Sequence, residues 1–282
     1  MIWTAIIFSG IKKLIGKSYI ERIIIKAIKN DIAIYAIHTN LDNVAHGVSA
    51  KIAEKLSLKN CKVLAPKKGF LRKLTVYCPS SDMHTLRNVL FQAGAGNIAN
   101  YDECSFTSIG EGTFRANQGC NPYLGEIGKR HVEKEEKLEV IFTKHQQESI
   151  LTAMYSAHPY EQVAYQIHVL ENIHQNIGSG IVGDLSEAID VESFLSMIKI
   201  NLKTDCIRHT KLINKKIQKV AVCGGSGSFL LPNALIAKAD IFITADFKYH
   251  EFFDTEDKII IADIGHYESE QFTKELVCDF LN

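Results

Sequence analysis

The sequence predicts a two-lobed α/β domain interrupted by an inserted α+β domain of the ferredoxin-like kind. Three observations predict this fold class. Apolar runs of strand length alternate with amphipathic runs along the whole chain, as in sheets buried between helices. A strand–helix–strand pattern occurs twice in the middle of the chain, which is typical of a ferredoxin-like fold. The 282 residues, of which 46% are hydrophobic, correspond to about two domains of roughly 150 residues.

The first lobe is predicted for residues 1–68. A helix is expected at 20–28 and a buried strand at 32–37, since each run has the length and apolar pattern of that element. A polar loop at 38–46 then leads into a second helix at 48–58. Open α/β sheets place their ligands at the carboxyl ends of strands, so this loop is a candidate site.

The inserted domain is predicted for residues 69–172 and contains the internal repeat. Its strands are expected near 73–76, 98–107, 137–140 and 163–170, and its helices at 82–93 and 146–156. The stretch 110–136 is rich in glycine, asparagine and charge, so it is expected to be a hairpin or a mobile loop.

The second lobe is predicted for residues 173–282. Its strands are expected at 219–223, 241–244 and 258–262, and its helices at 191–202, 232–238 and 268–281. The whole chain is therefore expected to be one α/β domain split by another domain.

The composition disfavours several classes of partner. The 32 basic and 32 acidic residues balance, so no broad positive field favours nucleic acid or an anionic membrane. No apolar stretch has the length of a spanning helix, and no basic segment precedes the first apolar residues, so a cytoplasmic protein is expected. The seven cysteines are odd in number and form no C-x-x-C pair, which favours reduced thiols, most of them in the core.

The first candidate site is the segment from His38 to Asp42, where an imidazole and a carboxylate follow the end of a predicted strand. Buried polar groups need partners, and a borderline divalent ion is one partner that suits both. The alternative interpretation is an N-capping Asp42 beside a hydrogen-bonded His38.

The second candidate site is the pair His266 and Glu270, which also follows a predicted strand. Residues four apart share one helix face, so the two side chains could hold one ion. The alternative is a solvated pair on a surface helix. If the two lobes face each other, this pair converges with His38 and Asp42, and a two-metal centre becomes chemically reasonable.

Other segments allow both functional and structural interpretations. His250 could be a ligand, a proton shuttle or a packed histidine. The glycine run at 178–183 fits G-x-G-x-x-G but lacks the strand-to-helix context of a dinucleotide site. The run at 223–228 could be an anion-binding nest or simply a tight turn, and Cys223 is expected to be a reduced core thiol. The segment 158–161, HPYE, could be a recognition loop or a helix stop with a stacked tyrosine.

Several segments occur in one order along the chain: HTNLDN, HPYEQVAYQIHVLEN, GSGIVGDL, CGGSGS, ADIFITADFKYHEFF and IADIGHYESE. Together they resemble the GTP cyclohydrolase 1 type 2 homologue family, Nif-like hexameric proteins with a dinuclear metal centre, in the long form that carries a PII-like insert. The resemblance covers nearly the whole chain. It implies that Asp42, His266 and Glu270 are metal ligands and that His38 and His250 lie near the metal cleft, which the loop 223–228 lines.

The resemblance also implies a homohexamer, a small-molecule ligand and two divalent ions per subunit, Zn, Fe or Mn. The family begins with a further segment that ends in His-His-Pro and supplies two more ligands. Trp3, Thr4 and Ala5 occupy those places here, and neither an indole nor a threonine hydroxyl replaces an imidazole well. We therefore expect a chain shortened at its front, which holds one ion or none, is less stable and assembles incompletely.

Three functional hypotheses follow. The first is a metal-dependent hydrolase of a nucleotide or phosphorylated small molecule, in which Asp42 and Glu270 hold the metal, His266 ligates it, and His250 or His38 moves protons. The alternative is a non-catalytic metal-binding or regulatory oligomeric assembly protein, whose insert senses a ligand or mediates contacts. A third hypothesis is a degenerate remnant without function.

Overall fold

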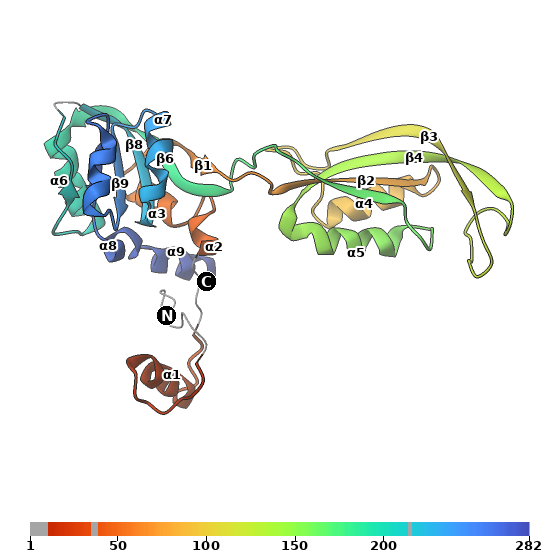
Figure 1. The fold of residues 1–282 in the computed structure, drawn as a ribbon, viewed down its shortest axis with the longest axis horizontal. Coiled ribbons are helices and arrows are strands. Elements are labelled where there is room, and N and C mark those ends of the chain that lie inside the picture. Colours follow the sequence, from red (N-terminus) through yellow and green to blue (C-terminus); the bar gives the residue numbers. More distant parts are fainter. Residues whose placement is uncertain (1–10, 35–38, 214–215, 282) are drawn as a thin grey trace. The chain divides into compact units, whose positions relative to one another are not determined.

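The computed structural model describes residues 11–34, 39–213 and 216–281. The chain divides into two compact units: Met1–Pro66 and Gln175–Asn282 belong to the first, and Lys67–His174 to the second (Figure 1). His38, the segment from Trp3 to Ala5 and the second half of the strand expected at 32–37 lie outside the described residues. Residues 32–34, which are described, form no strand.

The first unit is built on a mixed six-stranded sheet in the order β1-β6-β8-β9-β10-β7. The strands are β1 (Lys59–Pro66), β6 (Gly178–Asp190), β7 (Arg208–His209), β8 (Lys216–Ser226), β9 (Ile241–Ala245) and β10 (Ile260–Asp263). Strands β8, β9 and β10 run parallel, whereas β1, β6 and β7 pair antiparallel with their neighbours. The carboxyl ends of three parallel strands therefore meet at one edge.

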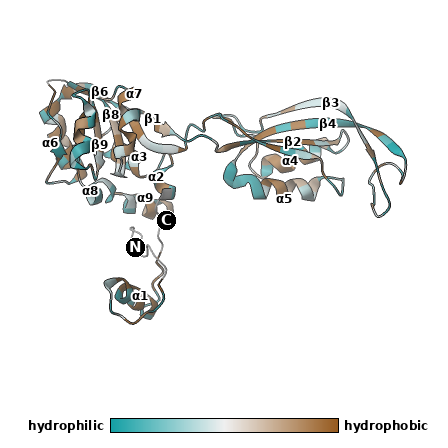
Figure 2. Cartoon of the chain, in the orientation of Figure 1, coloured by the Kyte–Doolittle hydropathy of each residue, from teal (hydrophilic) through white to brown (hydrophobic). Residues whose placement is uncertain are grey.

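Helices cover both faces of this sheet, which explains why β9 and β10 are buried along their whole length. On one face, Ile52 of α3 (Val48–Lys55) and Phe194 of α6 (Val191–Leu202) pack with Val222. On the other face, Leu231 of α7 (Leu231–Ile236) packs with Phe242. Figure 2 shows the central strands in the brown of hydrophobic residues. Each fully buried side chain contributes about 1.5–3 kcal/mol to folding.

Two longer helices of this unit, α1 (Tyr19–Lys29) and α6, begin at capping side chains that the sequence shows. Helix α1 confirms the helix expected at 20–28. It begins after Ser18, whose Oγ accepts a hydrogen bond of 3.2 Å from the Glu21 amide. Helix α6 matches its expected range of 191–202, because the Asp190 carboxylate caps it by accepting the Glu192 amide at 3.1 Å. The others are α2 (Thr39–Asp42), α8 (His266–Glu270), α9 (Thr273–Leu281) and the 3₁₀ turns η2 (Ser228–Leu230) and η3 (Tyr249–Thr255).

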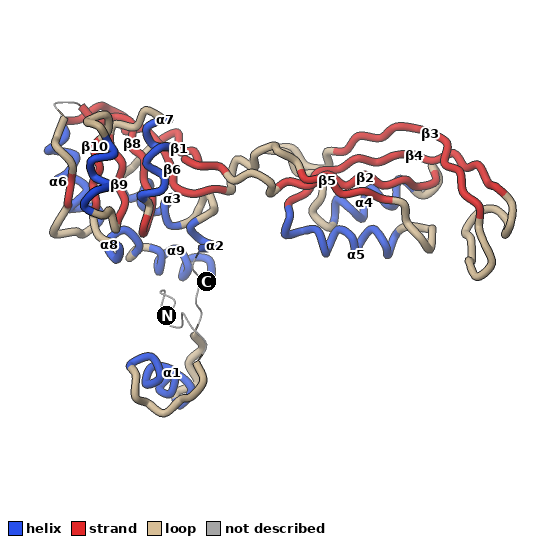
Figure 3. The backbone as a smooth tube through the Cα atoms, in the orientation of Figure 1, coloured by secondary structure: helices blue, strands red, loops and turns tan. Residues whose placement is uncertain are grey.

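The second unit has the strand–helix–strand pattern twice, as the repeat predicts (Figure 3). Its elements are β2 (Leu71–Pro79), α4 (Met83–Gln92), β3 (Ser105–Arg115), β4 (Arg130–Thr143), η1 (Lys144–Gln146), α5 (Gln147–Ala157) and β5 (Tyr165–Val169). The sheet order β3-β4-β2-β5, with every pair antiparallel, is the ferredoxin-like topology. Leu86 of α4 and Ile150 of α5 pack on Leu74 and Leu138 to form a separate core.

The stretch 110–136 is a hairpin, one of the two expected alternatives, because β3 continues to Arg115 and β4 begins at Arg130. Two other sequence expectations are corrected. The strand expected at 98–107 begins only at Ser105. The last helix, expected at 268–281, is two helices, α8 and α9.

Three strands, β1, β6 and the two-residue β7, were not predicted. The run 178–183 lies inside β6, where glycine allows other chains to approach closely. A Cβ at Gly183 would lie 2.9 Å from the Lys59 carbonyl of β1, and one at Gly180 would lie 3.1 Å from the Val222 carbonyl of β8. These glycines broke the apolar pattern that otherwise identifies a strand.

All seven cysteines are free, and of these only Cys78 and Cys223 are buried, so the expectation that most cysteines fill the core is wrong. Within the described residues, no helix combines the length and the apolarity that a membrane crossing needs.

Candidate functional site

The candidate site lies where β8, β9 and β10 end. Because these strands are parallel, the loops that follow them leave the sheet at the same edge. The glycine run 223–228 spans the end of β8 and the turn that follows it, Asp246 follows β9, and α8 with His266 and Glu270 follows β10. Groups from three distant segments are thereby brought together.

The imidazole of His266 lies between two carboxylates. Its Nδ1 is 2.5 Å from Oδ2 of Asp246, and its Nε2 is 3.2 Å from Oε2 of Glu270. Burial by itself would lower the pKa of His266, but the hydrogen bond to Asp246 and the charge of Glu270 raise it overall. The two carboxylates therefore stabilise the imidazolium form, which donates from both nitrogens, relative to a histidine in water.

Glu270 is the buried member of the group, with a side chain only 10% exposed. Burial, together with the charges of Asp42 and Asp246, raises the pKa of Glu270 to about 7, while His266 acts in the opposite direction. The interpretation of His266 and Glu270 as a solvated surface pair is therefore wrong for Glu270.

Asp42 ends α2 and is half-buried, and its negative charge acts on both Glu270 and Cys223. Asp42 is therefore close enough to α8 for its charge to affect Glu270. Its interpretation as an N-cap is wrong, because the following helix α3 begins after Gly47.

The glycine run 223–228, called the glycine loop below, packs tightly against α8. Gly225 has a φ of +66°, and a Cβ there would overlap the Glu270 carboxylate. Its amide donates to Ser269 Oγ at 2.9 Å, and the Gly224 amide donates to Ser49 Oγ at 3.4 Å. These two amides are used within the protein, so they do not contribute to an anion nest.

The other sequence candidates have different surroundings. Burial, with the charges of Asp42 and Glu270, raises the pKa of the Cys223 thiol to about 12, as expected for an unreactive core cysteine. His250 lies exposed on η3 and interacts electrostatically with Glu251, so the interpretation as a packed histidine is wrong. In the described part of the chain, no three His, Cys, Asp or Glu side chains are grouped closely enough to hold a metal ion as they stand.

Sequence reasoning missed two aspartates. Asp246 follows a buried strand directly, the same signal that singled out Asp42, and adopts the left-handed φ of +60°. Asp263 at the end of β10 is 3% exposed. Its carboxylate accepts the amides of Gly265 at 3.1 Å and Phe247 at 3.0 Å, so it joins the loops that carry His266 and Asp246.

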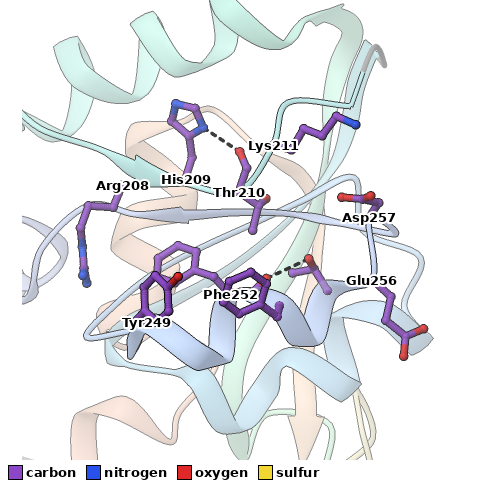
Figure 4. A pocket seen from close by; sticks show the side chains of 10 residues that line it. Arg208, His209, Thr210, Lys211, Tyr249, Phe252, Glu256 and Asp257 are labelled. Atoms are coloured by element: carbon purple, nitrogen blue, oxygen red, sulfur yellow. Dashed lines mark hydrogen bonds between the residues drawn. The ribbon is translucent and has the colours of Figure 1, made fainter.

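Asp263 also pairs with Arg208 of β7, and this arginine borders a cavity of about 550 Å³ (Figure 4). The Arg208 guanidinium lies 5.6 Å from the ring centroid of Phe252 in η3. Arg208 therefore links the cavity wall to the candidate site, through its ion pair with Asp263 and a hydrogen bond of 3.0 Å to the Phe247 carbonyl.

The fold and the site together define a class: a mixed α/β protein with a carboxylate–histidine group at the carboxyl ends of parallel strands and a ferredoxin-like insertion. The chain belongs to the DUF34/NIF3 (NGG1p interacting factor 3) family, whose model matches residues 4–282. The resemblance stated from the sequence motifs is thereby confirmed.

Curated relatives and solved structures agree with this assignment. The GTP cyclohydrolase 1 type 2 homolog of Halalkalibacterium halodurans is 39% identical over 263 residues, which cover 93% of this chain and 71% of the relative. The protein of the same description from Bacillus subtilis is 36% identical over 271 residues, covering 95% and 72%. The crystal structure of a Bacillus cereus protein related to NIF3 is 34% identical with a TM-score of 0.82, covering 98% of this chain and 75% of that one.

Proposed function

We propose that this protein binds a divalent metal ion through Asp42, His266 and Glu270 and that the loaded site hydrolyses a nucleotide or another phosphorylated small molecule. The observation that carries the proposal is the grouping of negative charge. The negative charges of Asp42 and Asp246 act on the buried carboxylate of Glu270, and the His266 imidazole lies between Asp246 and Glu270. Like charges held together in this way favour a bound cation.

The donor types fit such an ion. Two carboxylates and one imidazole are ordinary ligands of Zn, Fe and Mn, the metals expected from the family resemblance. To bind the metal ion, His266 must release the Nε2 proton that faces Glu270. Asp42 must then supply the third ligand. The number and identity of the ions, the hexamer and the PII-like character of the insert stay predictions.

The side chains around His266 have distinct roles in this proposal. Asp246 accepts from Nδ1 of His266 and so leaves Nε2 as the nitrogen available to a ligand, an arrangement common behind metal-binding histidines. Asp263 is a positioning residue, because it ties the loop after β9 to the turn before α8. A divalent ion, when bound, supplies Lewis acidity and lowers the pKa of water. We assign proton movement to His250 or His38.

Elemental analysis of the purified full chain tests the metal site. We expect bound Zn, Fe or Mn in the parent protein and loss of most of it in Asp42→Asn and Glu270→Gln. Glu187→Gln serves as the matched control, because Glu187 is an exposed carboxylate on β6. Equal metal content in the parent, Asp42→Asn and Glu270→Gln would remove the site assignment.

A turnover screen of the metal-loaded chain tests the hydrolase part. Phosphate release from GTP and from p-nitrophenyl phosphate is the readout, and we expect it to depend on Glu270. Bound metal without turnover on either compound would favour the non-catalytic alternative. That alternative draws on one observation, since the second unit has a core of its own and could act as a sensing module.

A further inference from the structure

The HPYE segment of the second unit, which the metal site does not involve, forms an ordered turn. His158 ends α5, and its Nε2 donates to the Tyr77 carbonyl at 2.8 Å while its Nδ1 accepts the Tyr160 amide at 3.1 Å. Both nitrogens are thus used by the backbone. The buried imidazole fixes the direction in which Tyr160 leaves the turn.

Tyr160 is the centre of an aromatic cluster. Its ring centroid lies 5.2 Å from that of His158, 5.9 Å from that of Phe114 and 6.3 Å from that of Tyr123. All of these pairs are tilted or edge-to-face, so the rings form angled walls rather than one continuous stack.

Three of these rings border a cavity of about 350 Å³, whose lining comes from β2, β3, the loop after β3, β4 and the segment that begins at Tyr160. The volume is within the range of small-molecule sites. The loop is held in place, because the Glu161 carboxylate accepts the Asn121 amide at 3.2 Å and the Ala116 carbonyl accepts the Gly128 amide at 2.8 Å.

The charge of the lining is predominantly negative. Glu135 accepts the Tyr160 hydroxyl at 2.9 Å, and Glu161 borders the same cavity. Gly112 leaves room for the Glu135 carboxylate, which a Cβ at this position would overlap. Among the residues that line the cavity, the basic one is Arg115, whose side chain is exposed.

We propose that this cavity binds a small organic cation, an ammonium group attached to an apolar or aromatic body. The faces of Tyr160, Phe114 and Tyr123 attract the cation through their ring quadrupoles and accommodate the apolar body. The Glu135 carboxylate supplies the opposite charge. The insert is thus a ligand-binding module in its own right, independent of metal at α8.

Isothermal titration of the full chain with phenethylammonium chloride tests this site. We expect a Kd of about 1 mM or tighter, with 2-phenylethanol and 3-phenylpropionate binding at least about tenfold more weakly because they lack the positive charge. Glu135→Gln is expected to weaken phenethylammonium about tenfold, and Tyr160→Leu to remove measurable binding.

Two further variants separate binding from folding. Tyr160→Phe keeps the ring and is expected to bind within about threefold of the parent. Glu148→Gln removes an exposed carboxylate from α5 and is expected to leave Kd unchanged. Thermal unfolding checks that each variant is folded. The proposal is overturned if phenethylammonium does not bind, if 2-phenylethanol or 3-phenylpropionate binds as tightly, or if folded Glu135→Gln retains the parent Kd.

Discussion

His266 and Asp246 are twenty residues apart in the chain, yet Nδ1 of the imidazole lies 2.5 Å from Oδ2 of the carboxylate. The parallel pairing of β9 with β10 creates this contact, because Asp246 follows one strand and His266 follows the other. The contact orients the imidazole so that Nε2 faces Glu270.

Asp246→Asn is expected to weaken divalent-metal binding about 10–100-fold, since an amide holds the histidine tautomer and basicity less well than a carboxylate. Asparagine tolerates the left-handed φ at this position, so the backbone is retained. Titration with Zn²⁺ against a competing chelator gives the affinity. Asp254→Asn, an exposed aspartate on η3, is the control, and equal affinities for all three proteins would contradict the assigned role.

Asp263→Ala is expected to lower the free energy of unfolding by about 2–4 kcal/mol, because the buried amide of Phe247 and the partly buried amide of Gly265 lose their acceptor. Chemical denaturation measures the change. Asp254→Ala should change stability by less than about 0.5 kcal/mol. If Asp263→Ala is as stable as Asp254→Ala, the carboxylate does not hold the two loops.

Gly225→Ala is expected to reduce both stability and metal content. A methyl group there meets the Glu270 carboxylate, and the φ of +66° is unfavourable for alanine, so the loss should exceed about 1–2 kcal/mol. Gly119→Ala separates the two causes, because Gly119 has a φ of +96° with nothing within 4 Å of its Cβ position. The steric argument predicts the larger loss at Gly225, and similar losses at both positions would count against it.

Acidification is expected to destabilise the second unit through His158. Burial lowers the pKa of this imidazole below 6.5, although its hydrogen bond to Tyr77 and the charge of Glu135 act in the opposite direction. The unfolded chain therefore binds the proton first as pH falls, so stability is complete above about pH 6.5 and declines below it until the folded pKa is passed. Denaturation of parent and His158→Gln between about pH 7 and pH 5 measures this, and parallel pH profiles would show that His158 is not responsible.

Local patterns were sufficient for many elements of the fold. Helix α6 follows from an amphipathic run behind the capping Asp190, and β9 from the apolar run Ile241–Ile243. These signals depend only on neighbours along the chain. Strand β6 was missed because glycines interrupt its apolar pattern. These glycines make room for β1 and β8, which pair with β6 in the sheet and are distant from it in the sequence.

Some residues of the candidate site were also identified from the sequence, and others only from the structure. Asp42, His266 and Glu270 could be proposed from residue type, spacing and family resemblance, because each follows a predicted strand or shares a helix face. Asp246 and Asp263 could not be assigned roles, since their importance depends on which strands pair and in which register. Burial of Glu270 likewise depends on the glycine loop that packs against α8. The chemical type of each side chain is known from the sequence. The charge interactions that shift its pKa act through space, between segments that only folding brings together.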